Sequence, residues 1–241
     1  MRDDVKGDSV LVNGISAGDI GDTKKVRRQE IKKGLISFAI FIGCQVVFSL
    51  LWLLVLQDLF SANETVGVSI VNYTNSFVLL LVFLILYFKT LKADVKRLTG
   101  KNIIFIAIMV VVDKGLEALF SILTNLIQGN VAANQQQNEA MMATYIIPTV
   151  LMVLIYGPIV EELVFRKALN LVITNKAVFI VLSAILFGFI HSSGSIDFAV
   201  IGYIVSGLIY AIVYLKTDRN IAASILVHFL SNLVASIFIL I

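Results

Sequence analysis

The feature of this sequence that most restricts its fold is a succession of seven apolar segments. They lie at residues 34–56, 68–88, 103–127, 144–166, 177–192, 198–215 and 221–241. A helix needs ~20 residues to cross ~30 Å of hydrocarbon, and most of these segments are close to that length. Lipid offers no hydrogen-bond partner to the backbone, and the segments lack the alternation of barrel strands. The predicted fold class is therefore all-α, a polytopic transmembrane helix bundle of about seven spans.

The composition excludes the main alternatives to a membrane protein. Apolar residues make up 59% of the chain and charged residues 15%, against about 45–50% and about 25% in an ordinary soluble domain. A soluble domain with this composition would expose large apolar patches, and disorder requires low hydrophobicity and high charge. The net charge of +3 is too small for a nucleic-acid partner, and the single cysteine excludes a disulfide framework. The predicted partner is the lipid bilayer.

The basic residues predict the orientation of the spans. They are concentrated before the first span, between the second and third, after the fourth, and after the sixth. These residues are Lys24, Lys25, Arg27, Arg28, Lys32 and Lys33, then Lys89, Lys92, Lys96, Arg97 and Lys101, then Lys176, and finally Lys216 and Arg219. The intervening loops, around 58–64, 128–143 and 192–197, contain no lysine or arginine. Because cytoplasmic loops carry the excess of positive charge, we expect a cytoplasmic N-terminus and seven spans in a cell membrane, most simply the bacterial cytoplasmic membrane.

The same pattern divides the chain into three parts. Residues 1–33 are polar and lack the apolar core of a signal peptide, so we expect a retained cytosolic tail. Residues 34–143 are expected to form three N-terminal transmembrane helices. Residues 144–241 are expected to form a core of about four further transmembrane helices that carries the chemistry.

Ionisable side chains in the C-terminal spans mark the candidate site, because such groups are costly within a bilayer. The segment 157–166 reads Gly-Pro-Ile-Val-Glu-Glu-Leu-Val-Phe-Arg. The segment 187–191 reads Phe-Gly-Phe-Ile-His, and the segment 228–232 reads His-Phe-Leu-Ser-Asn. The only two histidines of the chain thus fall in apolar spans. We expect these three segments to form one site.

Helical spacing assigns different roles to the two adjacent glutamates. Glu162 and Arg166 stand at i and i+4, the favourable order for an ion pair on one helix face. Glu161 points roughly 100° away from Glu162 and has no cation at i+3 or i+4. We therefore predict that Glu161 is the general base and that Glu162 is the structural partner of Arg166.

The other two motifs repeat the i, i+4 spacing. His228 and Asn232 share one helix face, so that they can offer two hydrogen-bond donors to one developing oxyanion. Phe187 lies on the same face as His191, where its ring would form a wall of the site or fix the histidine rotamer.

The three motifs, in this order on successive membrane helices, resemble those of the CPBP family, which comprises the type II CAAX prenyl endopeptidases and the bacteriocin-processing or self-immunity (Abi) proteins. The resemblance covers about residues 144–241 and implies an intramembrane endopeptidase that acts on a membrane-associated or lipidated peptide or protein. It also implies that Glu161 activates water with the help of His191. His228 and Asn232 would hold the oxyanion, while Glu162 and Arg166 complete the first motif.

The metal content of the site has two readings. Members of the family are often classed as metalloproteases, and Glu161, His191 and His228 have the chemistry to hold zinc with one position open. The spacing, however, is not His-Glu-x-x-His, asparagine is a poor zinc ligand, and a glutamate–histidine pair can activate water unaided. We therefore expect no cofactor, with zinc as the alternative.

Two other functions compete with proteolysis. The chain would also suit a non-catalytic bacteriocin self-immunity or membrane scaffold protein. A small transporter would need a relay such as Asp113, Lys114 and Glu117 in the third span, but no inverted repeat supports it. These three residues form either an internally paired cluster or the lining of a substrate or water path.

Overall fold

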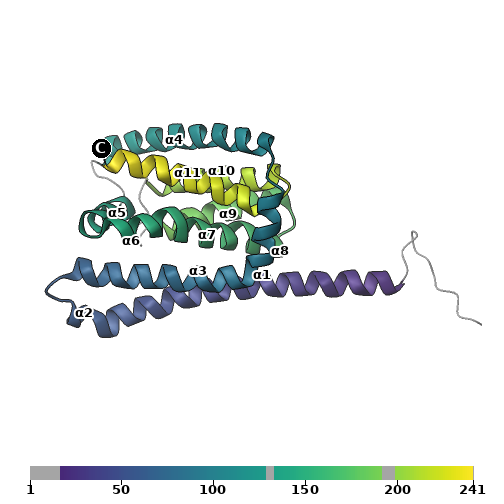
Figure 1. Cartoon of the computed structure of the whole chain (residues 1–241), viewed down its shortest axis with the longest axis horizontal. Coiled ribbons are helices and arrows are strands. Elements are labelled where there is room, and N and C mark those ends of the chain that lie inside the picture. The colour runs from purple at the N-terminus through teal and green to yellow at the C-terminus, as the bar shows by residue number, and fades with distance from the viewer. Residues whose placement is uncertain (1–16, 129–132, 192–198, 241) are drawn as a thin grey trace, which may run out of the picture.

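A computed structural model describes residues 17–128, 133–191 and 199–240 of the chain (Figure 1). Within these ranges the regular secondary structure consists of helices, and no strand is present. The predicted class, an all-α helix bundle, is confirmed. Each of the seven apolar segments falls on a helical stretch, although residues 192, 198 and 241 lie outside the described ranges.

The N-terminal half contains three long helices and one short one. Helix α1 (Ala17–Leu51) continues through the π-helix η1 (Trp52–Leu56) into α2 (Gln57–Leu59), and is followed by α3 (Glu64–Lys96), α4 (Gly100–Gln128) and α5 (Ala133–Thr144). Helix α1 begins before residue 34, the expected start of the first span, because hydropathy marks where a helix enters lipid and not where the helix begins. Residues 23–33 are rich in Lys, Arg, Gln and Glu, which are good helix formers.

The C-terminal half begins with one long helical stretch built from five elements. These are α6 (Ile146–Leu151), the π-helix η2 (Met152–Tyr156), α7 (Gly157–Glu162), the π-helix η3 (Leu163–Ala168) and α8 (Leu169–Val172). After a short link come α9 (Lys176–Ile190), α10 (Ala199–Lys216) and α11 (Ile221–Leu240). Helix α9 starts where Oδ1 of Asn175 accepts hydrogen bonds from the backbone N–H groups of Ala177 and Val178, which satisfies two of its otherwise unpaired N-terminal donors.

Four helical stretches in the described ranges are long and apolar enough to cross a membrane. They are Thr23–Leu59, Glu64–Lys96, Ile146–Val172 and Ile221–Phe238; Lys176–Ile190 and Val200–Lys216 are apolar but shorter. Helix α4 is long but does not belong to this group, because its middle carries three charged residues, Asp113, Lys114 and Glu117. The chain is thus a multi-pass membrane protein, while the count of seven spans and the cytoplasmic N-terminus stay predictions.

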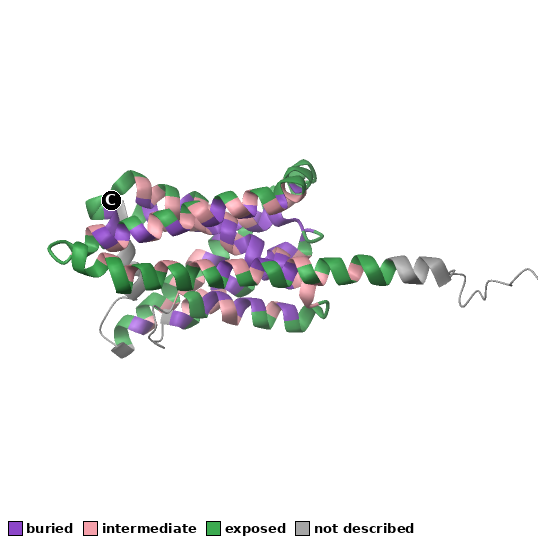
Figure 2. Cartoon of the chain, turned by 90° about the horizontal axis from the view of Figure 1, so that it is seen from below, coloured by how far each residue is buried: buried purple, intermediate pink, exposed green. Residues whose placement is uncertain are grey.

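The helices lie side by side, with α4 along one edge of the bundle and α1 and α3 along the opposite edge (Figure 1). Between them lie α7, α9, α10 and α11, which carry the three motifs or pack against them. Buried residues gather between the helices, whereas much of α1 is exposed (Figure 2). Exposed apolar side chains of α1, such as Val46 and Val47, form a surface suited to lipid.

Helices α9 and α10 make the most extensive helix–helix contact, and two glycines allow it. A Cβ atom on Gly188 would lie 3.1 Å from the backbone nitrogen of Ile204 and 3.2 Å from the carbonyl oxygen of Val200. A Cβ atom on Gly207 would lie 3.1 Å from Cα of Ala184. Small residues of this kind let membrane helices approach closely. The approach positions Phe187, one residue before Gly188, against α10.

Replacing Gly188 by alanine is expected to lower the melting temperature of the protein in detergent, because the new methyl group would meet α10 backbone. Overpacking costs about 1–3 kcal/mol, which exceeds the ~1 kcal/mol of helix propensity that alanine gains over glycine. Gly202→Ala on α10 is the control, since its nearest neighbour would be Cβ of Phe120 at 3.7 Å, and it should leave the melting temperature unchanged or raised. Equal melting temperatures for the two variants would contradict the close contact.

Candidate active site

The two adjacent glutamates end the short helix α7, which has a π-helical segment on each side. Such segments are rare and occur often at functional sites. The side chain of Glu162 is fully buried, whereas that of Glu161 is 19% exposed. The two carboxylates therefore face different surroundings, as the helical spacing predicted.

Glu162 connects three elements of the buried core. Nε of Arg166 lies 3.1 Å from Oε2 of Glu162, so the predicted pairing is present. The same oxygen accepts a hydrogen bond from Oγ of Ser224 on α11. Its other oxygen, Oε1, lies 3.1 Å from Nδ1 of His228. Glu162 thus holds Arg166 and also His228; the contact with His228 was not predicted from the sequence.

Arg166 is fully buried and is held by groups from α9 as well as by Glu162. Its Nη1 donates a hydrogen bond of 2.9 Å to Oγ of Ser183, which in turn donates to the carbonyl oxygen of Phe165 at 2.8 Å. The guanidinium carbon lies 5.0 Å from the centre of the Phe187 ring. The carboxylate, the hydroxyl and the aromatic face offset part of the hydration that the buried guanidinium loses, while its Nε and Nη2 have no hydrogen-bond partner among the described residues.

The orientation of His228 follows from its contact with Glu162. A carboxylate that is ion-paired with Arg166 can only accept hydrogen bonds. Nδ1 of His228 therefore carries the hydrogen and donates a hydrogen bond to Oε1 of Glu162. The other ring nitrogen, Nε2, lies 4.0 Å from Oε2 of Glu161. The imidazole is stacked on Tyr210 with ring centres 4.7 Å apart.

His191 is oriented in a similar way, with Nδ1 held by a hydrogen bond and Nε2 near Glu161, but it lies at the end of a helix and not within one. Its Nδ1 lies 2.7 Å from the carbonyl oxygen of Phe187, to which it donates, and its Nε2 lies 3.7 Å from Oε2 of Glu161. Its ring is stacked on Tyr203 at 4.7 Å. The expected span of 177–192 placed His191 inside a helix, but α9 ends at Ile190 and His191 is its C-terminal cap.

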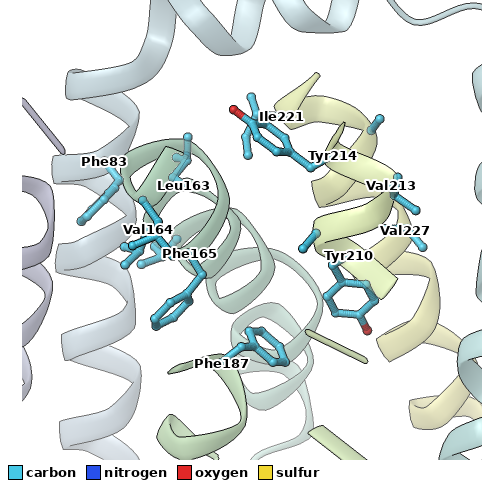
Figure 3. Close-up of a cluster of buried hydrophobic side chains, with 14 of the residues drawn as sticks. Phe83, Leu163, Val164, Phe165, Phe187, Tyr210, Val213, Tyr214, Ile221 and Val227 are labelled. Atoms are coloured by element: carbon cyan, nitrogen blue, oxygen red, sulfur yellow. The ribbon is translucent and has the colours of Figure 1, made fainter. Parts of the chain in front are cut away.

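Phe187 lies between the two imidazoles, with ring centres 4.6 Å from His191 and 5.5 Å from His228. It is also in edge-to-face contact with Phe165 and Tyr210, at 6.1 Å and 5.7 Å (Figure 3). These contacts agree with the predicted wall, and the carbonyl group of Phe187 additionally fixes the rotamer of His191.

Glu161, His191 and His228 therefore meet around one point, from α7, the end of α9 and α11. Oε2 of Glu161 is inaccessible to solvent and accepts no hydrogen bond from any residue that the structure describes. Two atoms that each bind one water at about 2.8 Å stand roughly 3.6–4.6 Å apart. The separations of 3.7 Å and 4.0 Å from Oε2 to the two Nε2 atoms fall in this range.

The fourth predicted catalytic residue, Asn232, has a different partner. Its Nδ2 donates a hydrogen bond of 2.9 Å to the carbonyl oxygen of Val153 in η2. Asn232 thus shares α11 with His228, but its side chain is hydrogen-bonded to η2. Its role as an oxyanion donor stays a prediction.

The three side chains that form the alternative zinc site, Glu161, His191 and His228, stand farther apart than the ligands of a bound zinc ion. Two ligands about 2.0–2.1 Å from a tetrahedral zinc ion stand about 3.4 Å apart, closer than the 3.7 Å and 4.0 Å from Glu161 to the two imidazoles. Among the described residues, no group of three or more His, Cys, Asp or Glu side chains is arranged to hold a metal ion. We derive no step through a metal.

Sequence reasoning missed the aromatic partners of the two imidazoles. Tyr203 and Tyr210 stand seven residues apart on α10, which places them on one face two turns apart. That spacing is visible in the sequence. The spacing alone does not indicate a functional role, because tyrosines in an apolar helix are ordinarily core or interfacial residues.

The fold and the site define a class of membrane proteins in which a buried carboxylate and two imidazoles meet inside a helix bundle. Residues 143–234, which contain all three motifs, match the family described as "Type II CAAX prenyl endopeptidase Rce1-like". The resemblance to the CPBP family is therefore confirmed, over this part of the chain. At the level of the family, the match supports a membrane-embedded protease.

Two bacterial proteins are similar to the chain. An uncharacterized protein of Mycoplasma capricolum is 25% identical over 96 residues, which cover 40% of this chain and 29% of that protein. The UPF0177 protein YajF of Lactococcus lactis is 26% identical over 169 residues, which cover 70% of this chain and 83% of that protein. No solved structure matches the chain.

Proposed function

We propose that the chain is an intramembrane endopeptidase that hydrolyses peptide bonds in membrane-associated or lipidated peptides or proteins. The observation that carries this proposal is the meeting of Glu161 with both imidazoles, at 3.7 Å and 4.0 Å, in an apolar bundle. A carboxylate oxygen without a hydrogen-bond partner, next to two imidazole nitrogens, is suited to bind and deprotonate one water.

In the proposed reaction, one hydrogen of the water is bound by Oε2 of Glu161 and the other by the unprotonated Nε2 of His191. Glu161 takes its proton as the water oxygen bonds to the scissile carbonyl carbon, and the carbonyl oxygen becomes an oxyanion. The carbon–nitrogen bond then breaks as the proton moves from Glu161 to the leaving amine. This leaves a carboxylic acid, an amine and the original Glu161 carboxylate.

His228 and Asn232 are proposed to stabilise the oxyanion. Because Nδ1 of His228 donates to Glu162, its Nε2 carries no proton in the neutral ring. In the proposed reaction, His228 takes a proton from solvent water before the attack, and its Nε2 then donates to the oxyanion as part of an imidazolium. Asn232 uses one amide hydrogen on Val153 and keeps the other for the oxyanion. We propose that this set acts without a metal, since the donor geometry suits a hydrogen-bonded water.

The substrate class is proposed from the family and from the apolar surroundings. A type II CAAX prenyl endopeptidase is named for a lipidated C-terminal segment, and a bacteriocin precursor or signal propeptide has similar membrane affinity. Both relatives are bacterial, which supports the bacterial cytoplasmic membrane as the setting.

The proposal is tested by cleavage in proteoliposomes. The full chain is incubated with a farnesylated Cys-aliphatic-aliphatic-X peptide, its unprenylated form and a bacteriocin-type precursor, and the products are identified by mass spectrometry. Cleavage of at least one peptide at a defined bond is expected. If the folded protein cleaves none of them, the endopeptidase proposal fails for these substrate classes and the non-catalytic immunity or scaffold alternative takes its place.

Chelation is expected to leave the cleavage rate unchanged within about twofold, because the water is held by hydrogen bonds and not by a metal. The measurement compares the same peptide with and without 1,10-phenanthroline, after dialysis. A zinc-dependent peptidase treated in parallel shows that the chelator is effective. Loss of activity that added zinc restores would overturn the metal-free mechanism.

A further inference from the structure

The buried carboxylate of Asp113 lies next to the site, although it comes from α4 and so from outside the family-matched segment. Its side chain is fully buried, and its Oδ2 accepts a hydrogen bond of 3.2 Å from the hydroxyl of Tyr210. Lys114, whose Nζ lies 3.9 Å from the same oxygen, pairs with Glu117. Asp113 is thus attached to α10 as well as to its charged neighbour.

Tyr210 in turn contacts most of the groups in the site. Its ring is stacked on His228 at 4.7 Å with an angle of 24° between the planes. Its edge-to-face contact with Phe187 leaves the hydroxyl pointing away from that ring (Figure 3). Its carbonyl oxygen accepts a hydrogen bond of 3.3 Å from Ser224, the residue that also donates to Glu162.

We infer that Asp113 and Tyr210 are positioning residues for His228, an inference that rests on the proposed function. Two constraints act on the imidazole in different directions. The hydrogen bond from Nδ1 to Glu162 fixes rotation within the ring plane, and the stacked Tyr210 ring fixes the tilt of that plane. The bond to Asp113 holds the Tyr210 ring in place. Together they aim Nε2 at Glu161.

The alternative is that Asp113 serves only the charge pairing with Lys114. Pairing alone explains the Asp113 contact poorly, because Lys114 is already paired with Glu117 and is farther from Asp113 than the Tyr210 hydroxyl is. Oδ1 of Asp113 accepts no hydrogen bond from a described residue, so its burial costs stability. A buried carboxylate that costs stability and contacts a residue of the site, as Asp113 contacts Tyr210, is typical of a group kept for function.

The orientation of His228 can be measured without any substrate, because the chain contains only two histidines. Protein labelled with ¹⁵N-histidine is examined by NMR in detergent, and the His191→Gln variant assigns the signals. Wild-type His228 is expected to give one set of signals, protonated at Nδ1. Tyr210→Phe and Asp113→Ala are expected to broaden or split this set at constant pH.

Tyr87→Phe is the matched control for this spectrum. Tyr87 is 1% exposed, and its hydroxyl is hydrogen-bonded to Ser37 at 2.8 Å, so the substitution removes the same buried group from a region away from the histidines. It should leave the His228 signals as in the wild type. Wild-type signals in Tyr210→Phe would overturn the inference, as would equal disturbance in Tyr87→Phe.

Cleavage of the farnesylated peptide gives a second, independent readout. Asp113→Ala and Tyr210→Phe are each expected to lower kcat roughly 10- to 100-fold with KM unchanged. The double variant should be about as slow as either single one, because the two residues act through one bond. Asp113→Asn keeps an oxygen that accepts from the hydroxyl and should retain most activity.

Additive losses, or an Asp113→Asn variant as slow as Asp113→Ala, would overturn the positioning role. If the wild-type chain cleaves no peptide, the proposed function fails, and the NMR comparison still decides whether Asp113 and Tyr210 orient His228. The two failures are therefore distinguishable.

Discussion

The Glu161→Gln variant is expected to lose cleavage activity about a thousandfold while keeping its fold. General-base catalysis contributes about 10²–10⁴-fold, and an amide of the same shape cannot take a proton from water. Oε2 of Glu161 accepts no hydrogen bond from a described residue, so the substitution breaks no such contact of that oxygen. The measurements are kcat on the cleaved peptide and the melting temperature in the same detergent.

Glu64→Gln provides the matched control, since Glu64 is an exposed glutamate in the first turn of α3. It undergoes the same chemical change away from the site and should retain wild-type activity. Undiminished cleavage by Glu161→Gln would remove Glu161 from the mechanism. A large fall in melting temperature would instead assign it a structural role.

Replacing Arg166 by methionine is expected to destabilise the protein by about 3–5 kcal/mol. The substitution keeps much of the side-chain volume but leaves the buried carboxylate of Glu162 without its cation. Unfolding in a denaturing detergent, followed by circular dichroism, measures the loss. Activity should fall with it, because Glu162 also holds Nδ1 of His228.

Arg97→Met is the control for this substitution. Its Nη2 lies 3.0 Å from Oδ1 of Asp94, but the Arg97 side chain is 51% exposed. Asp94 also keeps the hydrogen bond that its Oδ2 accepts from the backbone N–H of Ile221, so we expect a smaller loss of stability. The double variant Glu162→Gln with Arg166→Met should recover part of the lost stability, since no unpaired charge remains. Equal losses for Arg166→Met and Arg97→Met would contradict the buried ion pair.

The sequence predicted those parts of the site that depend on spacing along one helix. The pairing of Glu162 with Arg166 and the contact of Phe187 with His191 both follow from i, i+4 geometry, and both are present. The helices themselves follow from hydropathy, because the bilayer leaves few other solutions for the backbone.

Contacts between helices could not be predicted in the same way. The bonds from His228 to Glu162 and from Asn232 to Val153 depend on the rotation of α11 against η2 and α7. That rotation is set by packing among many side chains, and the π-helical segments on each side of α7 change it further. No spacing rule along the chain reports it.

Helix α10 makes the two imidazoles mechanically dependent on each other. Tyr203 and Tyr210 rest on His191 and His228 respectively, and both belong to one rigid helix that packs against α4. A small turn of α10 about its own axis would shift both rings together.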